Sequence, residues 1–475
     1  MRQNERPLVV DLDGTLIHSD ILLESIANLL RDKPYLFLAL PFWLLKGKAA
    51  FKSKLASHVN VDIKSLPFNT ELIKWLKLQK TCGRRLLLCT ASNFTAAERV
   101  AKHLDLFDGV LASDDTRNLA GRSKALILEN LYGKNGFDYV GNSKADLFVW
   151  EKSKVAVIVN GSKKLIKHVA SLTEIGHNIP KQKIGIKDWI NVFRSHQWIK
   201  NLLIFVPVLA AHQLITFEVG KDLILAFLSF SFCASSVYIL NDLLDLESDR
   251  RHLRKCSRPF ASGRISLLCG LAFAPILLIT SISIAININP LFLFWLLIYF
   301  GITCAYSWGL KRLVLVDCLT LAILYTLRIV AGAVAVSVPL SFWLLAFSTF
   351  IFLSLAFVKR FAELEIQPNE SNARIYGRGY YPNDSSLIKQ LGISSGFSAV
   401  LVLALYLNSD NVTKLYQTPE IIWGAIPLML LWISWMWLQA QRGTMHDDPI
   451  IFAIKDNTSI LIGLAFISIF IIAGI

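Results

Sequence analysis

The sequence of 475 residues contains seven cysteines, and no two of them are spaced as a C-x-x-C pair. Most of them lie in apolar stretches, so neither a disulfide framework nor a zinc site is predicted, and a reducing compartment fits. We also expect no secretory signal, since the first fifteen residues are polar and then strand-like. We therefore expect the N-terminal part to remain in the cytoplasm.

Charge is scarce in the last 275 residues, which contain nine apolar stretches. Hydrophobic residues make up 54% of the chain and the mean hydropathy is +0.48, which is high for a soluble protein. This asymmetry predicts a soluble domain followed by an all-α, multi-pass membrane domain of about nine helices. We expect the spans near residues 202–216, 223–240, 266–287, 291–306, 313–336, 340–358, 390–407, 420–438 and 458–475.

The net charge of +14 suggests an anionic partner, and the position of the charge narrows the choice. The loops after the second, fourth, sixth and eighth spans carry 15 Lys and Arg residues, whereas the opposite loops carry only Lys221 and Lys414. This bias predicts that the basic loops and the N-terminal domain lie on the cytoplasmic face of the inner membrane. A basic face at the bilayer favours phosphate groups or anionic headgroups over nucleic acid. Homo-oligomerisation stays open.

Residues 1–172 alternate between strand-like and helical segments, which predicts a doubly wound, Rossmannoid α/β domain. An insertion near 20–80 contains the apolar run 35–47, which is too short to cross a bilayer. We expect this run to pack on the domain or to rest in the membrane interface. Residues 173–198 are expected to form a linker and an interfacial helix, followed by the membrane domain at 199–475. The expected strands are 8–13, 85–92, 137–142 and 155–160.

The stretch VVDLDGTLIHSD places two carboxylates at the end of the first expected strand. Asp11 can attack phosphorus, and Asp13, two residues on, projects to the same side and can handle the leaving-group proton. Both can hold Mg²⁺, and Gly14 permits a sharp exit turn. Ordinary turn chemistry is the alternative explanation for this motif.

Three companion motifs favour the catalytic interpretation. Thr90 ends the second expected strand, Lys124 follows in a polar loop, and GNSKAD ends another strand with Asp146 at its close. In order and spacing these motifs resemble those of the haloacid dehalogenase (HAD) phosphatase superfamily. The resemblance implies that Asp11 is the nucleophile and Asp13 the acid and base. It also implies that Thr90 and Lys124 bind phosphate, and that the fourth motif completes a Mg²⁺ site.

The fourth motif departs from the family pattern, because Asn142 stands where the family usually has a carboxylate. An amide oxygen can still ligate Mg²⁺ but brings no charge. Two alternatives follow: a working phosphatase with weakened metal affinity, or a fold retained for structure or regulation. The sequence also leaves open whether Lys124 or Lys144 serves the phosphate.

A second acidic motif stands at the cytoplasmic end of the second expected span. The sequence NDLLDLESD carries Asn241, Asp242, Asp245 and Asp249, and a continuing helix would place the three aspartates on one face. Such oxygen ligands suit Mg²⁺ that carries a diphosphate, and Arg258 with neighbouring basic residues would neutralise the phosphate oxygens. The alternative is a solvated helix end with Asp–Arg pairs. A carboxylate row at membrane depth nevertheless favours a functional site.

The N-D-x-x-D-x-x-x-D motif in a chain with nine expected spans resembles the UbiA superfamily of intramembrane prenyltransferases. The second Asp-rich motif of ordinary members is missing, because the loop 358–384 is basic and aromatic. The stretches RSHQWIKNLLIFVP and HDDPIIFAIKD resemble the polyprenyl-phosphate phosphoribosyltransferase branch, whose best-known member is the decaprenyl-phosphate enzyme of arabinan synthesis, a cell-wall polysaccharide pathway. The resemblance covers residues 187–475, and HAD domains fused ahead of this branch are a familiar arrangement.

This resemblance implies a reaction. Phosphoribosyl would pass from phosphoribosyl pyrophosphate to a polyprenyl phosphate with Mg²⁺, and the HAD domain would then remove the 5-phosphate. Cations at the cytoplasmic rim would hold the lipid phosphate, with Lys200, Lys311, Lys359 and Arg360 as candidates. Tyr306 with Lys311 matches an element of the branch, unless the pair is an interface anchor. Arg328, inside a span, is expected to face a polar cavity. Asp447 and Asp448 either add a ligand or cap a helix.

Two other functions compete with this one. A UbiA-type aromatic prenyltransferase would use a prenyl diphosphate, and the missing second aspartate motif disfavours it. A non-catalytic membrane anchor or transporter would tether the HAD domain, but a transporter would more naturally carry charges in mid-span and show repeated halves.

Overall fold

The computed structural model describes residues 6–45, 47–114, 117–211, 216–252, 254–365, 379–409, 416, 418–445 and 448–474. The chain forms two compact units. The first, the α/β unit, comprises Met1–Phe193 with Tyr238–Ala274, and the second, the helical unit, comprises Arg194–Val237 with Pro275–Ile475. The segment that carries the second acidic motif thus belongs to the α/β unit rather than to the expected 199–475 domain.

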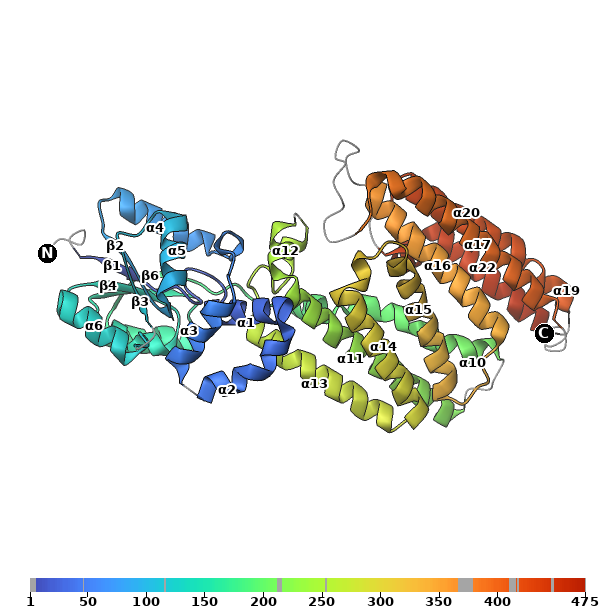
Figure 1. Ribbon diagram of the computed structural model, residues 1–475, viewed down its shortest axis with the longest axis horizontal. Helices are drawn as coiled ribbons and strands as arrows, with labels where there is room; N and C mark the ends of the chain where they lie inside the picture. Colours follow the sequence, from blue (N-terminus) through green and yellow to red (C-terminus); the bar gives the residue numbers. More distant parts are fainter. Residues whose placement is uncertain are drawn as a thin grey trace. The chain divides into compact units, whose positions relative to one another are not determined.

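The α/β unit is built on a parallel sheet of six strands in the order β3-β2-β1-β4-β5-β6 (Figure 1). The order reverses direction between β1 and β4, so the carboxyl ends of these neighbouring strands flank the crevice where doubly wound folds bind their ligands. This arrangement confirms the predicted α/β class. The strands are β1 (Leu8–Val10), β2 (Leu86–Asn93), β3 (Gly109–Ser113), β4 (Asp138–Gly141), β5 (Val155–Val159) and β6 (Glu174–Ile179).

Alternation along the buried strands divides the hydrophobic core into two layers. Val10 and Leu88 pack on one face of the sheet with side chains from α4 (Thr70–Thr81) and α5 (Phe94–Leu104). Val9 and Leu87 pack on the other face with side chains from α6 (Arg122–Tyr132), α7 (Leu147–Trp150) and α8 (Lys163–Leu172). Both faces are covered, which explains why the strands read as continuous apolar runs.

The sheet corrects the prediction of a linker at its far edge. Residues 174–179, expected in the linker, form β6, which pairs with β5. As an edge strand it keeps polar side chains in solvent, so its sequence lacks the apolar run of a central strand. The four predicted strands are present as β1, β2, β4 and β5, and β3 was not predicted.

The insertion after β1 contains α1 (Ile21–Asp32), the 3-10 helix η2 (Pro34–Ala39), α2 (Leu40–Leu45) and α3 (Lys48–His58). Trp43 packs against Phe51 and Leu55 in a small core. Leu38 and Leu45 are 77% and 85% exposed. The apolar run 35–47 therefore packs on its domain along one side and presents apolar side chains along the other.

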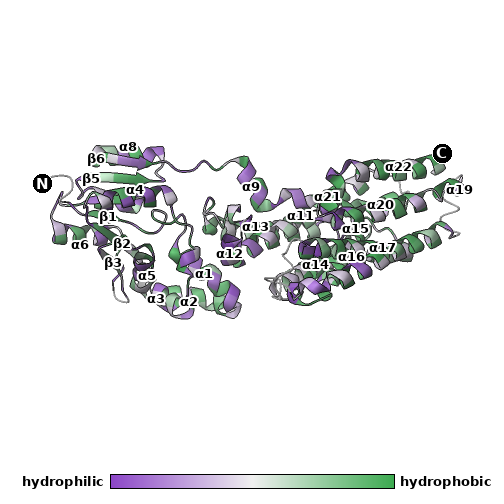
Figure 2. Cartoon of the chain, turned by 90° about the horizontal axis from the view of Figure 1, so that it is seen from above, coloured by the Kyte–Doolittle hydropathy of each residue, from purple (hydrophilic) through white to green (hydrophobic). Residues whose placement is uncertain are grey.

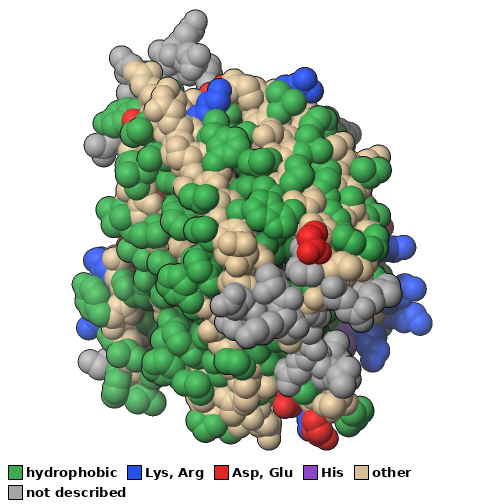
Figure 3. All heavy atoms as spheres, turned by 90° about the vertical axis from the view of Figure 1, so that its right-hand side faces the viewer, with side chains coloured by type: hydrophobic (Ala, Val, Ile, Leu, Met, Phe, Trp, Pro, Cys, Tyr) green, Lys and Arg blue, Asp and Glu red, His purple; other side chains and the backbone are tan. Residues whose placement is uncertain are grey.

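The helical unit and the two helices that it shares with the α/β unit contain the hydrophobic spans. Among the described residues, eight helices are long and apolar enough to cross a membrane, which supports a multi-pass membrane protein (Figure 2). Hydrophobic side chains also dominate the face drawn in Figure 3. The eight are α11 (Phe217–Leu244), α13 (Leu267–Ile286), α14 (Pro290–Trp308), α15 (Val316–Ala335), α16 (Phe342–Glu365), α17 (Ser385–Leu407) with the preceding turn, α19 (Pro419–Ile422) with α20 (Ala425–Gln441), and α22 (Asn457–Gly474).

The structure differs at the first of the nine expected spans, 202–216. A 3-10 segment, η5 (Ser195–Phe205), leads into the short helix α10 (Val206–Ala210), and residues 212–215 lie outside the described part. Pro207 stands in the first turn of α10, where its missing N–H costs no helical hydrogen bond. Proline can thus begin this helix but cannot continue one through the preceding residues.

Candidate active sites

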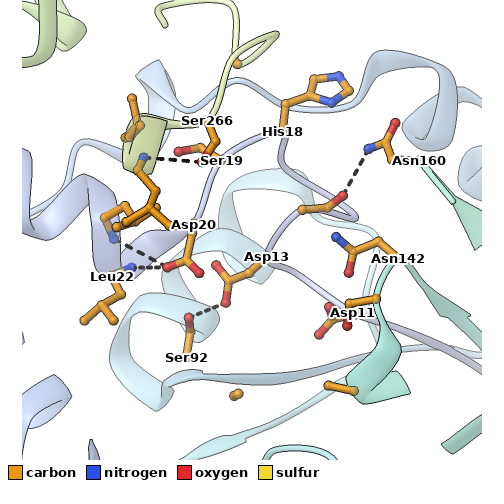
Figure 4. A pocket seen from close by; sticks show the side chains of 18 of the residues that line it. Asp11, Asp13, His18, Ser19, Asp20, Leu22, Ser92, Asn142, Asn160 and Ser266 are labelled. Carbon is orange, nitrogen blue, oxygen red and sulfur yellow. Dashed lines mark hydrogen bonds between the residues drawn. The ribbon is translucent and has the colours of Figure 1, made fainter. Parts of the chain in front are cut away.

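The first site lies at the carboxyl edge of the sheet. Asp11 and Asp13 directly follow β1, Thr90 lies near the end of β2, and Asn142 directly follows β4. Strand pairing brings these ends together, so the sheet itself positions the residues that resemble the HAD motifs. Asp11, Asp13 and Asn142 line a cavity of about 630 Å³ (Figure 4), whereas Thr90 is not among its lining residues.

Lys124 reaches this site from the first turn of α6. Its Nζ lies 2.7 Å from Asp11 Oδ1 and donates to the Tyr139 hydroxyl at 3.0 Å. The lysine is 4% exposed, whereas Lys144 is an exposed residue of the 3-10 turn η4 (Lys144–Asp146). Of the two lysines left open by the sequence, Lys124 is therefore the one that contacts Asp11.

Asp13 is held by different partners. Its Oδ2 accepts a hydrogen bond from Ser92 Oγ at 2.6 Å (Figure 4). The same oxygen accepts from Thr90 Oγ1 at 3.4 Å, and Oδ1 accepts from the Ile21 backbone N–H at 2.9 Å. Ser92 was not predicted as a site residue, although it stands two residues after Thr90 on the same strand and so projects the same way.

The Asp146 carboxylate forms hydrogen bonds to the backbone of the loop that carries Asn142. Its Oδ2 accepts from the backbone N–H groups of Asn142 and Ser143 at 3.1 and 2.9 Å, and its Oδ1 accepts from the Tyr139 hydroxyl at 2.8 Å. These bonds occupy both carboxylate oxygens, so in this arrangement Asp146 positions the Asn142 loop. A Cβ on Gly14 would lie 2.1 Å from Asn142 Nδ2, so the loop packs directly on the exit turn of the DLDGT motif.

Burial sets the electrostatics of the two carboxylates after β1. Desolvation raises the pKa of Asp11 to about 7, although the Lys124 ammonium opposes the rise. Desolvation, together with the charge of Asp20, raises the pKa of Asp13 to about 6. A divalent cation would offset the cost of placing these two carboxylates, one buried and one half-buried, side by side. The carboxylates and the Asn142 amide oxygen are hard donors of the kind that Mg²⁺ prefers. The residues present therefore fit Mg²⁺.

The second acidic motif forms a row at the junction of α11 and α12 (Leu246–Arg251). The backbone N–H groups of Asp245 and Asp249 donate to the carbonyls four residues earlier at 2.9 and 2.8 Å, so helical spacing continues through the junction. Arg258 Nη1 donates to Asp242 Oδ1 at 3.1 Å and to Asp249 Oδ2 at 2.6 Å. One guanidinium thus bridges two carboxylates that are 3% and 2% exposed.

The donor set of this row suits a metal-bound diphosphate. Burial raises the pKa of Asp249, and the Arg258 guanidinium opposes the rise. Like-charged carboxylates gathered in a poorly solvated place favour a cation, and oxygen donors suit Mg²⁺. Arg258, which the sequence predicts to contact the diphosphate, forms hydrogen bonds to the carboxylates that would hold the metal.

Within the helical unit, Asp448 organises a cationic cluster. Its Oδ2 lies 2.6 Å from Lys200 Nζ and 3.4 Å from Lys359 Nζ, and the Tyr325 hydroxyl donates to it at 3.3 Å. These two lysines hold the pKa of Asp448 far below its usual range despite burial. Asp448 also caps α21 (Pro449–Lys455), which is the helix-cap role that the sequence suggested, while Asp447 lies outside the described residues.

Arg328 adjoins this cluster on α15. Its guanidinium donates to Asn201 Oδ1 at 2.8 Å and to the Tyr299 hydroxyl at 2.9 Å, and it stacks over the Tyr325 ring at 5.6 Å. The Lys200 ammonium lies at the same distance from that ring. Arg328 is thus surrounded by polar and aromatic groups, as expected for a charge at this depth. Asn201 and Tyr325 were not predicted.

Arg360 was expected at the cytoplasmic rim but lies in the protein interior. It is fully buried, forms ion pairs with Asp317 and Glu363, and stacks over the Tyr380 ring at 5.3 Å. A buried, paired guanidinium is a structural element rather than a rim cation. Tyr306 lies in the last turn of α14 and Lys311 lies in the following 3-10 turn, and both are half-buried.

Sequence comparison relates the whole chain to known proteins. The model of the UbiA prenyltransferase family matches residues 202–454, more than half of the chain. The protein y4nM of Sinorhizobium fredii is 36% identical over 98% of this chain and 91% of its own length. The nodulation protein NoeC of Azorhizobium caulinodans is 34% identical over 61% of this chain and 94% of its own length. The decaprenyl-phosphate phosphoribosyltransferase of Mycobacterium tuberculosis is 34% identical over 59% and 91%.

Solved structures align with each part of the chain. A UbiA homolog from Archaeoglobus fulgidus bound to GPP and Mg²⁺ shares 16% identity over 59% of this chain and 99% of its own, with a TM-score of 0.44. A substrate-bound phosphoserine phosphatase shares 14% identity over 38% of this chain and 96% of its own, with a TM-score of 0.28. The family match confirms the resemblance drawn from the N-D-x-x-D-x-x-x-D motif. The chain belongs to the UbiA prenyltransferase family.

Proposed function

We propose that the protein transfers 5-phosphoribosyl from phosphoribosyl pyrophosphate to a polyprenyl phosphate at the cytoplasmic membrane face. The observation that carries this proposal is the single acidic row, in which Asp242 and Asp249 meet at Arg258. One carboxylate row suits one diphosphate. Relatives from three species, Mycobacterium tuberculosis among them, are named decaprenyl-phosphate phosphoribosyltransferases, which supports the choice of donor and acceptor.

In the transfer step a phosphate oxygen of the lipid attacks C1 of the ribose. The bond between C1 and the diphosphate oxygen breaks, and the diphosphate leaves with the bonding electron pair. Bound Mg²⁺ would neutralise the charge that grows on the leaving group. We assign the metal to Asp242, Asp245 and Asp249 with Asn241, and we assign to Arg258 a charge-assisted contact with the diphosphate oxygens.

We assign the acceptor phosphate to the cluster of Lys200 and Lys359. Lys200 and Lys359 both contact the carboxylate of Asp448, which brings two ammonium groups to one place where an anion can be bound. Asp448 fixes the two long side chains before the substrate arrives, which lowers the entropy lost on binding. Arg328 and Tyr306 with Lys311 remain proposed contacts of the same substrates.

The α/β unit would act next as a phosphatase. Asp11 attacks the phosphorus of the ribose 5-phosphate, the bond to the ribose oxygen breaks, and Asp13 gives that oxygen a proton. Water then attacks the aspartyl phosphate, Asp13 takes the proton, and inorganic phosphate leaves. Thr90 and Lys124 would hold the phosphate oxygens, and Mg²⁺ on Asp11, Asp13 and Asn142 would offset their charge. The product is a lipid-linked ribose.

We also propose that the N-terminus and the basic loops face the cytoplasm, in the inner membrane, as the distribution of Lys and Arg suggests. A membrane-impermeant thiol reagent tests this in intact cells. We expect Cys256, an exposed residue of the loop after the acidic row, to be protected until the cells are opened. Labelling of Cys256 in intact cells would reverse the orientation.

The test of the transferase uses purified protein in detergent with Mg²⁺, ribose-labelled phosphoribosyl pyrophosphate and a polyprenyl phosphate. We expect label in the lipid extract, and loss of that label in Asp242→Asn. A protein that ignores these substrates but consumes a prenyl diphosphate with an aromatic acceptor would be a prenyltransferase instead. A protein inactive in both assays would support the membrane-anchor alternative.

A further inference from the structure

The cavity above Asp11 and Asp13 has a wall from a distant part of the sequence. Phe260, Ser262 and residues 263–268 line the same cavity as the two carboxylates. We call residues 258–268 the cap loop. It follows the acidic row of the proposed transferase site in sequence, and Ser266 stands beside the phosphatase-like site in Figure 4.

Close packing holds the cap loop on the turn that follows Asp13. Gly263 has a φ of +71°, and a Cβ there would lie 2.5 Å from His18 Cβ. The position therefore requires glycine both for its backbone conformation and for the lack of space. Arg264 also holds the cap loop in place, because its guanidinium donates to Asp188 Oδ1 at 2.7 Å and to Ser262 Oγ at 3.1 Å.

A buried ion pair anchors the helix that leads into the cap loop. The Arg250 guanidinium donates to both carboxylate oxygens of Glu24, at 2.7 and 3.0 Å, and its Nε donates to the Ala261 carbonyl at 2.9 Å. Arg31 adds a contact of 2.6 Å to Glu247. Since Glu24 and Arg31 belong to α1, these contacts join the insertion after β1 to α12 and to the cap loop.

The lining of the cavity changes in character along the cap loop. Ser262 and Ser266 are small and polar, whereas Leu267 and Leu268 begin α13. On the α1 side Leu22 and Leu23 add further apolar lining. α13 is long and apolar enough to cross a membrane. Its first turn also forms part of the wall of the cavity that contains Asp11 and Asp13, so a candidate membrane helix begins at the phosphatase-like site.

We propose that the cap loop makes this cavity selective for phosphate monoesters carried by a membrane amphiphile, with the loop on the leaving-group side. The catalytic end, at Asp11 and Lys124, recognises the phosphate, and the leucines at the start of α13 accept the first part of an apolar tail. A water-soluble sugar phosphate fills only the polar half of the cavity. This inference extends the proposed phosphatase step, and it does not depend on the transferase step.

The test compares two synthetic esters that differ only in the tail: dodecyl riboside 5-phosphate in detergent micelles and methyl riboside 5-phosphate. We expect the full-length protein to show kcat/KM at least about tenfold higher for the dodecyl ester, because burying two or more methylene groups changes binding by that factor. Gly263→Ala should lower this ratio towards one, since it pushes the cap loop from His18. The control is Gly133→Ala, which has a similar φ of +75° but open space around it and should keep the wild-type ratio.

Equal efficiency for the two esters in the wild type, or a ratio unchanged in Gly263→Ala, would overturn the inference. A second measurement covers the case in which neither ester is hydrolysed and the phosphatase step itself fails. Hydrogen exchange of residues 260–268 is followed in Asp11→Asn protein with each ester present. Slower exchange with the dodecyl ester alone supports the cap, and equal exchange with both esters contradicts it.

Discussion

Arg258 Nη1 lies 2.6 Å from Asp249 Oδ2, and both residues belong to the segment that follows the second acidic motif. The same nitrogen contacts Asp242 at 3.1 Å. This guanidinium thus contacts two buried carboxylates, at the place where the proposed reaction needs Mg²⁺. Binding of Mg²⁺ and diphosphate would exchange carboxylate contacts of Arg258 for phosphate contacts.

Removing a carboxylate from the row should remove the transfer reaction. Asp249→Asn keeps the shape of the side chain but loses the charge that holds Mg²⁺, so we expect transfer to fall by at least about 100-fold. Lipid-extractable label from phosphoribosyl pyrophosphate is the measurement. Glu218→Gln, on the exposed Glu218–Lys221 pair, is the matched control and should transfer at the wild-type rate. Comparable activity in the two variants would contradict the assignment.

Lys200 and Lys359 should determine the affinity for the acceptor, polyprenyl phosphate, rather than for the donor, phosphoribosyl pyrophosphate. Lys200→Met removes one of two ammonium groups around Asp448, and we expect KM for polyprenyl phosphate to rise about tenfold or more, as for a lost charged hydrogen bond. KM for phosphoribosyl pyrophosphate should change little. Lys389→Met, at a half-buried lysine whose ammonium donates to Gln441, serves as the control. An increase confined to the donor KM would move the cluster to the other substrate.

Arg360 should matter for stability and not for substrate affinity. Asp317→Asn leaves a fully buried guanidinium without its buried carboxylate, so we expect the free energy of unfolding to fall by about 3–5 kcal/mol. Thermal unfolding in detergent measures this change, and KM values of the remaining folded protein should stay at the wild-type level. A large rise in KM for polyprenyl phosphate without loss of stability would restore Arg360 as a rim cation.

Asn142 should limit the metal affinity of the phosphatase-like site. Asn142→Asp adds a charge to the oxygen donors at the end of β4, and we expect the Mg²⁺ concentration for half-maximal binding to fall about tenfold. Calorimetric titration of Mg²⁺ measures binding independently of turnover. Asn118→Asp, outside the cavity lining, is the control. Unchanged Mg²⁺ affinity in Asn142→Asp would show that this position does not contribute a ligand.

Local patterns were sufficient for much of the fold and for the phosphatase-like site. Continuous apolar runs marked the four buried strands, and parallel strands bring their carboxyl ends to one edge, so Asp11, Thr90 and Asn142 could be placed together. The edge strand β6 escaped prediction because its exposed face carries polar residues. Ser92 could have been found from the two-residue period of β2.

Contacts between distant residues could not be predicted. Lys200 and Asp448 are 248 positions apart, and nothing in either neighbourhood of the sequence indicates that they meet. Lys359 and Arg360 are consecutive, and both were expected at the rim. Successive residues of a helix point about 100° apart, so Lys359 faces Asp448 while Arg360 turns to Asp317.

The central claim, that one chain makes a lipid-linked phosphoribose and then dephosphorylates it, is tested most directly by a time course. Wild-type and Asp11→Asn proteins receive Mg²⁺, ribose-labelled phosphoribosyl pyrophosphate and polyprenyl phosphate, and the lipid products are separated. We predict that phosphoribosyl lipid appears first and turns into ribosyl lipid in the wild type, whereas Asp11→Asn accumulates only the phosphorylated product. Identical product mixtures from the two proteins, or no label in lipid at all, would contradict the account.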